Sequence, residues 1–214
     1  MVKRHESSSF GSAYAFPGGV LEDADRTVHD RCGGVSPDTA NQLLGLAEGG
    51  LNYFSAAVRE LFEETGVLLG ETRLEANKLT ELRVRLNDGS LSWESFAADS
   101  ELVMRCDCLH YFGFWITPTE LPKRYSTRFF LAELPEGQAA HHDGAELTDS
   151  CWMPAGQILQ ASKKNSMLVH YPTRKTLERI ANFDSTTALC EWARCCAEKG
   201  VICDQPAFSP DLLR

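Results

Sequence analysis

The sequence lacks any long hydrophobic run. No stretch of its 214 residues approaches the roughly 18 consecutive apolar residues of a membrane-spanning helix. The first residues, Met1 to Glu6, are mostly charged or polar and lack the apolar core of a secretory signal peptide. We therefore expect a protein that has no membrane partner, and the cytoplasm is its expected location.

Positive charge is also scarce. The chain has 21 lysines and arginines against 30 aspartates and glutamates, which gives a formal net charge of −9. This acidic balance argues against nucleic acid as the main partner, so a polyanionic substrate would need a local basic patch or a bound metal ion. Internal repeats and low-complexity linkers are lacking as well. We therefore predict a single domain over residues 1–214.

The sequence lacks a regular cysteine framework. Its 8 cysteines are irregularly spaced, which favours reduced thiols over disulfides. Residues 106–110 (Cys-x-Cys-x-His) and 195–196 (Cys-Cys) raise the question of zinc, but neither has a second half at the spacing of a zinc site. Buried or incidental thiols are the preferred interpretation.

What the sequence does have is a carboxylate cluster in a stretch of helical periodicity, residues 58–67. A helix would place Glu60, Glu63 and Glu64 on one side. An acidic, hydrated helix face is the ordinary interpretation, because each like-charged pair there costs only about a few tenths of a kcal/mol. Carboxylates converging in a cleft would instead need a cation, and oxygen ligands suit Mg²⁺ or Mn²⁺. Gly66 is placed to end the helix in a left-handed conformation.

The residues around this cluster resemble a known motif. The string Arg-Glu-apolar-x-Glu-Glu-x-Gly-apolar runs from Arg59 to Val67, and Phe-Pro-Gly-Gly lies upstream at residues 16–19. Together they are similar to the box of the Nudix hydrolase superfamily. The resemblance implies an α/β fold, an α/β/α sandwich around a mixed sheet, with Mg²⁺ or Mn²⁺ as cofactor. It also implies that the catalytic metal ligands are Glu60, Glu63 and Glu64.

The box is split in this chain. Asp25 stands where the family has a glutamate, and an apparent insertion at residues 26–58 separates it from Arg59. A Ser-Pro-Asp start at residues 36–38 and a Gly-Gly stop at residues 49–50 predict a short helix within the insertion. The resemblance implies that Arg59 acts by pairing with the acid at position 25. We expect this pair to be weakened, because aspartate is one methylene shorter than glutamate.

A split box of this layout resembles the branch of peroxisomal coenzyme A diphosphatases and their bacterial relatives. Residues 71–104 are predicted to be a second helical insertion, and residues 172–214 to hold C-terminal helices. The strand that normally precedes the glycine loop is reduced to residues 2–4, so we expect the first strand to be missing or truncated. The chain ends without a Ser-Lys-Leu-type peroxisomal address.

Two strand-like segments follow, at residues 111–117 and 126–132. The densest basic spot of the acidic chain lies around them. Arg124 and Arg128 are therefore candidates to bind a substrate phosphate through charge-assisted hydrogen bonds. Salt bridges at the rim of the site are the alternative role for both.

The resemblance implies metal-assisted hydrolysis of a nucleoside diphosphate linked to another moiety. Gly18 and Gly19 would let the backbone approach the metal or the phosphates. One of the box glutamates, or Glu146 in the loop before a strand predicted at residues 150–153, would take the proton of the attacking water. An ordinary exposed loop acid is the alternative for Glu146.

The substrate is less constrained than the chemistry. The branch implies coenzyme A or its acyl esters, but the upstream coenzyme A signature of other Nudix enzymes is not evident at residues 5–10. NADH and ADP-ribose therefore stay open, as does a non-catalytic Nudix-fold nucleotide-binding module. In each case the expected partner is a small-molecule nucleotide. A homodimer is the assembly left open.

Overall fold

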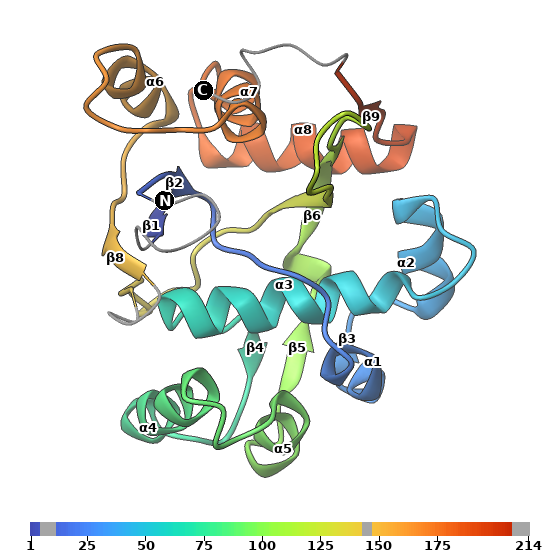
Figure 1. Ribbon diagram of the computed structural model, residues 1–214. Helices are drawn as coiled ribbons and strands as arrows, with labels where there is room; N and C mark the ends of the chain where they lie inside the picture. The colour runs from blue at the N-terminus through green and yellow to red at the C-terminus, as the bar shows by residue number, and fades with distance from the viewer. Residues whose placement is uncertain (5–11, 143–146, 207–214) are drawn as a thin grey trace. The chain divides into compact units, whose positions relative to one another are not determined.

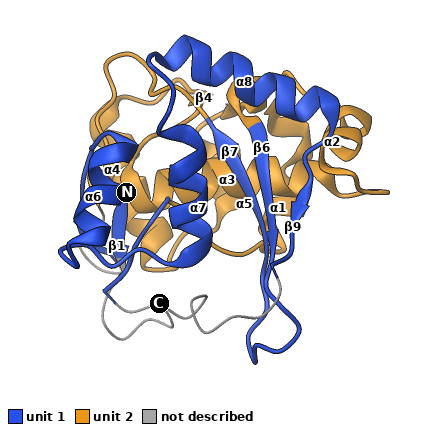
Figure 2. Ribbon diagram, turned by 90° about the horizontal axis from the view of Figure 1, so that it is seen from above, with its two compact units in different colours: residues 1–16, 111–131, 144–214 blue, residues 17–110, 132–143 orange. Residues whose placement is uncertain are grey.

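The computed structural model describes residues 1–4, 12–142 and 147–206. The chain divides into two compact units, which Figure 2 shows in blue and orange: unit 1 holds residues 1–16, 111–131 and 144–214, and unit 2 holds residues 17–110 and 132–143. The single domain expected from the sequence stays a prediction. In the described ranges, each helix is too short or too polar to traverse a bilayer.

Unit 2 is organised around α3 (Gly50–Thr65), the long helix that carries the carboxylate cluster (Figure 1). The elements before it are α1 (Ala24–Thr27), the 3-10 turn η1 (His29–Arg31), β3 (Cys32–Gly33) and α2 (Pro37–Leu44). The elements after it are β4 (Gly70–Glu71), α4 (Ala76–Asn87), α5 (Trp93–Asp99), β5 (Val103–Arg105) and the 3-10 turn η2 (Cys106–Cys108).

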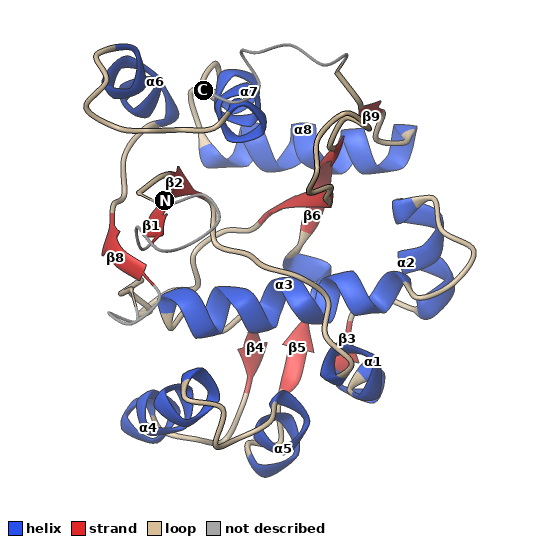
Figure 3. Ribbon diagram, in the orientation of Figure 1, coloured by secondary structure: helices blue, strands red, loops and turns tan. Residues whose placement is uncertain are grey.

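The sheet of unit 2 consists of short strands, drawn in red in Figure 3. β5 lies in the middle, parallel to β3 and antiparallel to β4, with Met104 opposite Cys32 on one side and Gly70 on the other. β4 and β5 correct the two ends of the helical insertion predicted at residues 71–104, whose middle does hold the helices α4 and α5. Met104 is buried between two exposed neighbours, which is the period of a strand rather than of a helix.

The insertion in the box holds more than the predicted short helix. Ser36 caps α2 as expected by accepting the N–H of Thr39 at 3.1 Å, but the helix ends at Gly45, with φ of 64°, rather than at residues 49–50. Gly50 instead begins α3. A Cβ on Gly50 would lie 2.5 Å from the carbonyl carbon of Ala40, so glycine is required where α3 packs on α2.

The apolar side of α3 forms the core of unit 2. Phe54, Val58 and Phe62 are at most 2% exposed. The ring of Phe62 stacks on Phe96 of α5 at 5.1 Å between centroids, and Phe96 stacks on Trp93 at 5.2 Å. Stacked rings of this size supply much of the core's contact area and fix the orientation of their neighbours. The back of α3 is therefore held by α5.

Unit 1 contains two sheets in its described residues. One has the strand order β2 (Tyr14–Ala15), β1 (Val2–Arg4), β8 (Leu147–Ser150), and the other has the order β7 (Ser126–Leu131), β6 (His110–Ile116), β9 (Cys203–Asp204). The helices are α6 (Ala155–Lys163), α7 (Tyr171–Ile180) and α8 (Thr186–Lys199).

The strands of unit 1 confirm some predictions and correct others. β6 and β7 coincide with the two predicted strand-like segments, and residues 2–4 form β1, which pairs antiparallel with β2 and β8. The strand predicted at residues 150–153 lies earlier in the chain, at β8. β9 is a strand within residues 172–214, where only helices were predicted; two residues are too few to show a period.

Candidate active site

Helix α3 positions the carboxylate cluster as the sequence predicted. Gly66 ends the helix in the left-handed conformation, with φ of 75°, and its N–H donates to the carbonyl of Phe62 at 2.8 Å. The cluster is not an ordinary hydrated face, because the side chains of Glu60 and Glu63 are only 14% and 22% exposed and Glu64 is buried. Such burial requires nearby groups that compensate the negative charge.

The compensating charge comes from Arg59, which is 2% exposed. Its Nε and Nη2 donate to the two carboxylate oxygens of Asp25 at 3.0 Å each, and Asp25 is fully buried. The pair forms with both oxygens in spite of the shorter side chain of aspartate, and its expected weakening stays a prediction. Helix α1 brings Asp25 close enough for a bidentate pair, and Asp25 Oδ2 is held in turn by the N–H of Glu22 at 2.8 Å.

The remaining guanidinium nitrogen of Arg59 joins this pair to the glutamates. Nη1 donates to Glu60 Oε1 and to Glu63 Oε2, both at 3.0 Å. Nη2 also donates to the carbonyl of Val20 at 2.9 Å. One buried cation therefore orients two of the three predicted metal ligands and the loop that follows the glycines.

The predicted glycine loop lies directly against the carboxylates. The N–H of Gly18 donates to Glu64 Oε2 at 2.9 Å. A Cβ on Gly19 would lie 2.3 Å from Glu60 Oε1, so any larger residue there would push Glu60 away. Gly18 has φ of 148°, a backbone conformation that L-residues with a side chain rarely adopt. The position of Glu60 therefore requires glycine at residue 19, and the backbone conformation favours glycine at residue 18.

Burial perturbs the ionisation of this cluster. It raises the pKa of Glu60 to about 7, although the positive charge of Arg59 acts in the opposite direction. Burial likewise raises the pKa of Glu63, again against Arg59. Burial alone would lower the pKa of Arg59, but its hydrogen bond to Asp25 and the surrounding carboxylates raise the pKa above the ordinary value. The glutamates are therefore poised to gain from a second cation.

The donor set is chemically suited to a hard divalent cation. Carboxylate oxygens are the ligands that Mg²⁺ and Mn²⁺ prefer, and oxygens of Glu60 and Glu63 already converge on a single atom, Arg59 Nη1. Among the described residues, no three histidine, cysteine, aspartate or glutamate side chains form a ready metal site. Glu60 and Glu63 are engaged by Arg59, and Glu64 by the N–H of Gly18.

The other predicted site residues belong to unit 1. Arg124 is exposed, and its Nε donates to the carbonyl of Thr117 at 3.2 Å. The guanidinium of Arg128 lies 4.5 Å from the ring centroid of Phe114, and its Nη1 donates to Ser126 Oγ at 3.3 Å. Their role in phosphate binding stays a prediction. Glu146 lies outside the described residues.

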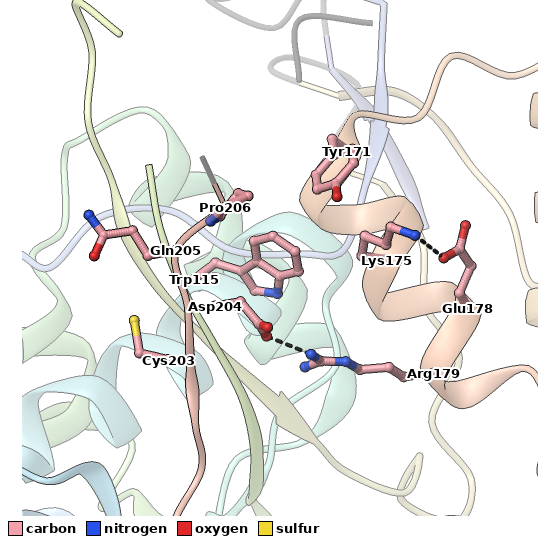
Figure 4. Close-up of a pocket in the computed structure, with 9 residues that line it drawn as sticks. All are labelled: Trp115, Tyr171, Lys175, Glu178, Arg179, Cys203, Asp204, Gln205 and Pro206. Carbon is pink, nitrogen blue, oxygen red and sulfur yellow. Dashed lines mark hydrogen bonds and ion pairs between the residues drawn. The ribbon is translucent and has the colours of Figure 1, made fainter. Parts of the chain in front are cut away.

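Unit 1 has a pocket of about 510 Å³ (Figure 4). Two ion pairs border it, Lys175–Glu178 at 2.7 Å and Arg179–Asp204 at 2.6 Å. The indole Nε1 of Trp115 is buried and makes no hydrogen bond within the described part of the chain. The pocket is lined by Trp115, Tyr171, Lys175, Glu178, Arg179, Cys203, Asp204, Gln205 and Pro206. Neither predicted phosphate-binding arginine is among them.

Sequence reasoning missed the residues behind the Arg59–Asp25 pair. Ser55 Oγ lies 3.4 Å from Asp25 Oδ1, and the indole Nε1 of Trp93 donates to Ser55 Oγ at 3.1 Å. The position of Ser55 one helical turn before Arg59 was a usable signal, since residues four apart share a helix face. Nothing in the sequence placed Trp93 beside it.

A helix that carries Arg-Glu-x-x-Glu-Glu and ends in glycine, with its arginine tied to an upstream acid and its glutamates against a Gly-Gly loop, is the arrangement of a Nudix hydrolase. Comparison with known families agrees. Residues 45–180, which are more than half of the chain, match the NUDT19 Nudix domain, and the protein belongs to this family.

Individual relatives are more distant. The chain is 27% identical to the acyl-coenzyme A diphosphatase NUDT19 of Homo sapiens, over 83% of this chain and 48% of that protein, and 26% identical to the NUDT19 of Gallus gallus, over 88% and 62%. It therefore spans about half to three fifths of their lengths. The crystal structure of a NUDIX hydrolase from Alicyclobacillus acidocaldarius matches 89% of this chain and 86% of that chain, with a TM-score of 0.68 and 22% identity. This likeness confirms the predicted α/β Nudix fold.

Proposed function

We propose that this protein is a divalent-metal-dependent pyrophosphohydrolase that cleaves a nucleoside diphosphate linked to another moiety, with coenzyme A or an acyl-coenzyme A as its substrate. The observation that carries the proposal is the convergence of Glu60 and Glu63 on Arg59 Nη1, beside a glycine loop that contacts Glu60 and Glu64. The name of the vertebrate relatives, acyl-coenzyme A diphosphatase, supports the choice of substrate.

Each group of the site has a role in this proposal. Glu60, Glu63 and Glu64 hold the cation, and Arg59, anchored by Asp25, keeps two of them oriented. Bound Mg²⁺ or Mn²⁺ neutralises phosphate oxygens and lowers the pKa of water. At Gly18, where a Cβ would meet nothing within 4 Å, the backbone is open to the substrate's phosphates, whereas the space beside Gly19 is taken by Glu60.

The proton of the attacking water goes to a carboxylate. The box glutamates and Glu146 are the candidates for this role. Arg124 and Arg128 supply positive charge to bind a substrate phosphate.

The proposal is tested by assaying the purified protein with Mg²⁺ or Mn²⁺ against coenzyme A, an acyl-coenzyme A, NADH and ADP-ribose, with products identified by mass. We expect coenzyme A to give 3′,5′-ADP and phosphopantetheine. Preferred cleavage of NADH or ADP-ribose would replace the substrate but keep the reaction. A folded protein that cleaves none of them would favour a nucleotide-binding module without turnover.

Glu63→Gln tests the metal site without disturbing the fold. The amide keeps an oxygen that accepts from Arg59 Nη1, but it loses the negative charge that a cation needs. We expect kcat to fall by more than about a hundredfold, since even groups behind the ligands of metal sites cost about 10- to 100-fold when mutated. Glu81→Gln, at an exposed glutamate on α4, is the control and should keep full activity. Full activity of Glu63→Gln would remove Glu63 from the site.

A further inference from the structure

A chain of buried hydrogen bonds extends from the Arg59–Asp25 pair into helix α5. Trp93 Nε1 donates to Ser55 Oγ at 3.1 Å, and Ser55 Oγ lies 3.4 Å from Asp25 Oδ1. The side chains are deeply buried, with Trp93 at 2% exposed and Ser55 and Asp25 at 0%. Water therefore does not compete for these bonds.

The chemistry of the three side chains determines which group donates and which accepts in each of these hydrogen bonds. An indole nitrogen can only donate, so the oxygen of Ser55 must accept from Trp93. The hydroxyl hydrogen of Ser55 is then available for Asp25, whose ionised carboxylate can only accept. Asp25 Oδ1 thus receives two donors, Ser55 Oγ and Arg59 Nε, which limits the ways in which the carboxylate can turn.

Packing holds the groups at both ends of this series of hydrogen bonds. The indole of Trp93 stacks on Phe96, which stacks on Phe62 of α3, so its N–H has little freedom to move. Ser55 and Arg59 are four residues apart on α3 and present their polar groups to the same carboxylate. The first residue of α5 is thereby connected to the guanidinium that orients Glu60 and Glu63.

We propose that Ser55 and Trp93 are positioning residues of the site: they hold Asp25 in the orientation that makes the bidentate pair with Arg59, and through Arg59 they hold Glu60 and Glu63. Their catalytic importance rests on the proposed function, whereas their effect on Arg59 does not. The segment between α3 and β5 is in this sense part of the active site, although none of its described residues is assigned as a metal ligand.

Two variants remove one bond each, and a third serves as control. Ser55→Ala deletes the hydroxyl, and Trp93→Phe deletes the N–H while keeping an aromatic ring on Phe96. Ser100→Ala is the control for Ser55→Ala, because Ser100 is also buried and its hydroxyl donates to the Phe96 carbonyl at 2.6 Å. The hydroxyl of Ser100 makes no hydrogen bond to Asp25, Ser55 or Trp93. Thermal unfolding of all three reports the structural cost alone.

The main measurement is hydrogen exchange of the Arg59 side-chain Nε–H, followed by NMR of arginine-labelled protein without substrate or metal. We expect exchange to become at least about tenfold faster in Ser55→Ala and in Trp93→Phe and to stay unchanged in Ser100→Ala. Unchanged exchange in both variants, or equal acceleration in the control, would overturn the proposal. If Ser55→Ala does not fold, Trp93→Phe decides the outcome alone.

Kinetics supply the second measurement on whichever substrate the protein cleaves. We expect kcat to fall about tenfold in Ser55→Ala and Trp93→Phe with KM unchanged, which is the lower end for groups that orient metal ligands. Equal loss in Ser100→Ala would mean a purely structural role and would count against the proposal. A protein without turnover would refute the proposed function, while the exchange measurement would still decide whether these residues position Arg59.

Discussion

Two arginine–aspartate pairs in unit 2 have the same geometry and opposite surroundings. In the pair Arg59–Asp25, and again in the pair Arg105–Asp107, Nε and Nη2 of the arginine each donate at 3.0 Å to one oxygen of the aspartate. The first pair is at most 2% exposed, whereas the side chains of the second are 45% and 40% exposed. Distance alone therefore does not distinguish a functional pair from a surface pair.

The difference lies in what each arginine can do with its remaining donors. Arg105 reaches an exposed carboxylate, Glu71, at 3.3 Å, in a setting where water can replace it. Arg59 is excluded from water, so its remaining donors must go to the carbonyl of Val20 and to Glu60 and Glu63. Burial makes the guanidinium a rigid template for the carboxylates, at the cost of desolvating several charges.

Removing the acid from each pair gives the largest contrast. We expect Asp25→Asn to lower the free energy of unfolding by about 3 kcal/mol or more, because it removes the fully buried charge that pairs with Arg59 through both oxygens. Asp107→Asn should lower it by less than about 1 kcal/mol, as is usual for exposed ion pairs. Urea unfolding of both variants checks this. Equal losses would mean that burial does not separate the two pairs.

The pH dependence of stability measures the energetic cost of burying the ionised carboxylate of Glu60. Burial raises the pKa of Glu60 to about 7 from 4.5, so the folded state favours the protonated carboxyl. Its contribution to stability is then complete below pH 4.5 and is lost as the pH rises through 7. Since one pKa unit corresponds to about 1.4 kcal/mol, the loss amounts to a few kcal/mol at most.

The measurement is the unfolding free energy of metal-free protein between pH 4.5 and 7, compared with Glu60→Gln, which cannot ionise. We expect wild type to lose stability relative to the variant as the pH rises, and Mg²⁺ to reduce this loss by stabilising the carboxylate. Parallel pH curves for the two proteins would show that Glu60 ionises in the folded state without penalty. Glu81→Gln, at an exposed glutamate, is the control and should follow wild type.

The sequence was sufficient for the part of the site that lies within one helix. Regular spacing places Glu60, Glu63 and Glu64 on one side of α3, and Gly66 is an unambiguous helix end, so both predictions needed only local rules. The partnership of Arg59 with Asp25 came from the resemblance to the Nudix box. Its bidentate geometry did not, because it depends on how α1 approaches α3.

The parts that sequence reasoning missed depend on distant contacts or on very short elements. Strands β3 and β4 have two residues each, which is too little to show an alternating pattern, and only pairing with β5 makes them strands. The bond between Ser55 and Trp93 joins residues 38 positions apart. It depends on how α5 packs against α3 through Phe96 and Phe62, which no local pattern of residues encodes.

Arg124 extends the comparison to an exposed arginine for which a binding role is proposed. Its Nε donates to the carbonyl of Thr117, and the side chain is otherwise accessible to a ligand phosphate. Because an exposed charge pair is worth at most about 1 kcal/mol, we expect Arg124→Ala to raise KM for coenzyme A by no more than about fivefold and to leave KM for dephospho-coenzyme A nearly unchanged. Steady-state kinetics on both substrates checks this.

Arg73→Ala, at an exposed arginine paired with Glu101 in unit 2, is the control and should change neither KM value. An equal rise for both substrates would show that Arg124 does not recognise the 3′-phosphate. Arg124 would then resemble Arg105, an exposed arginine that contacts only exposed side chains.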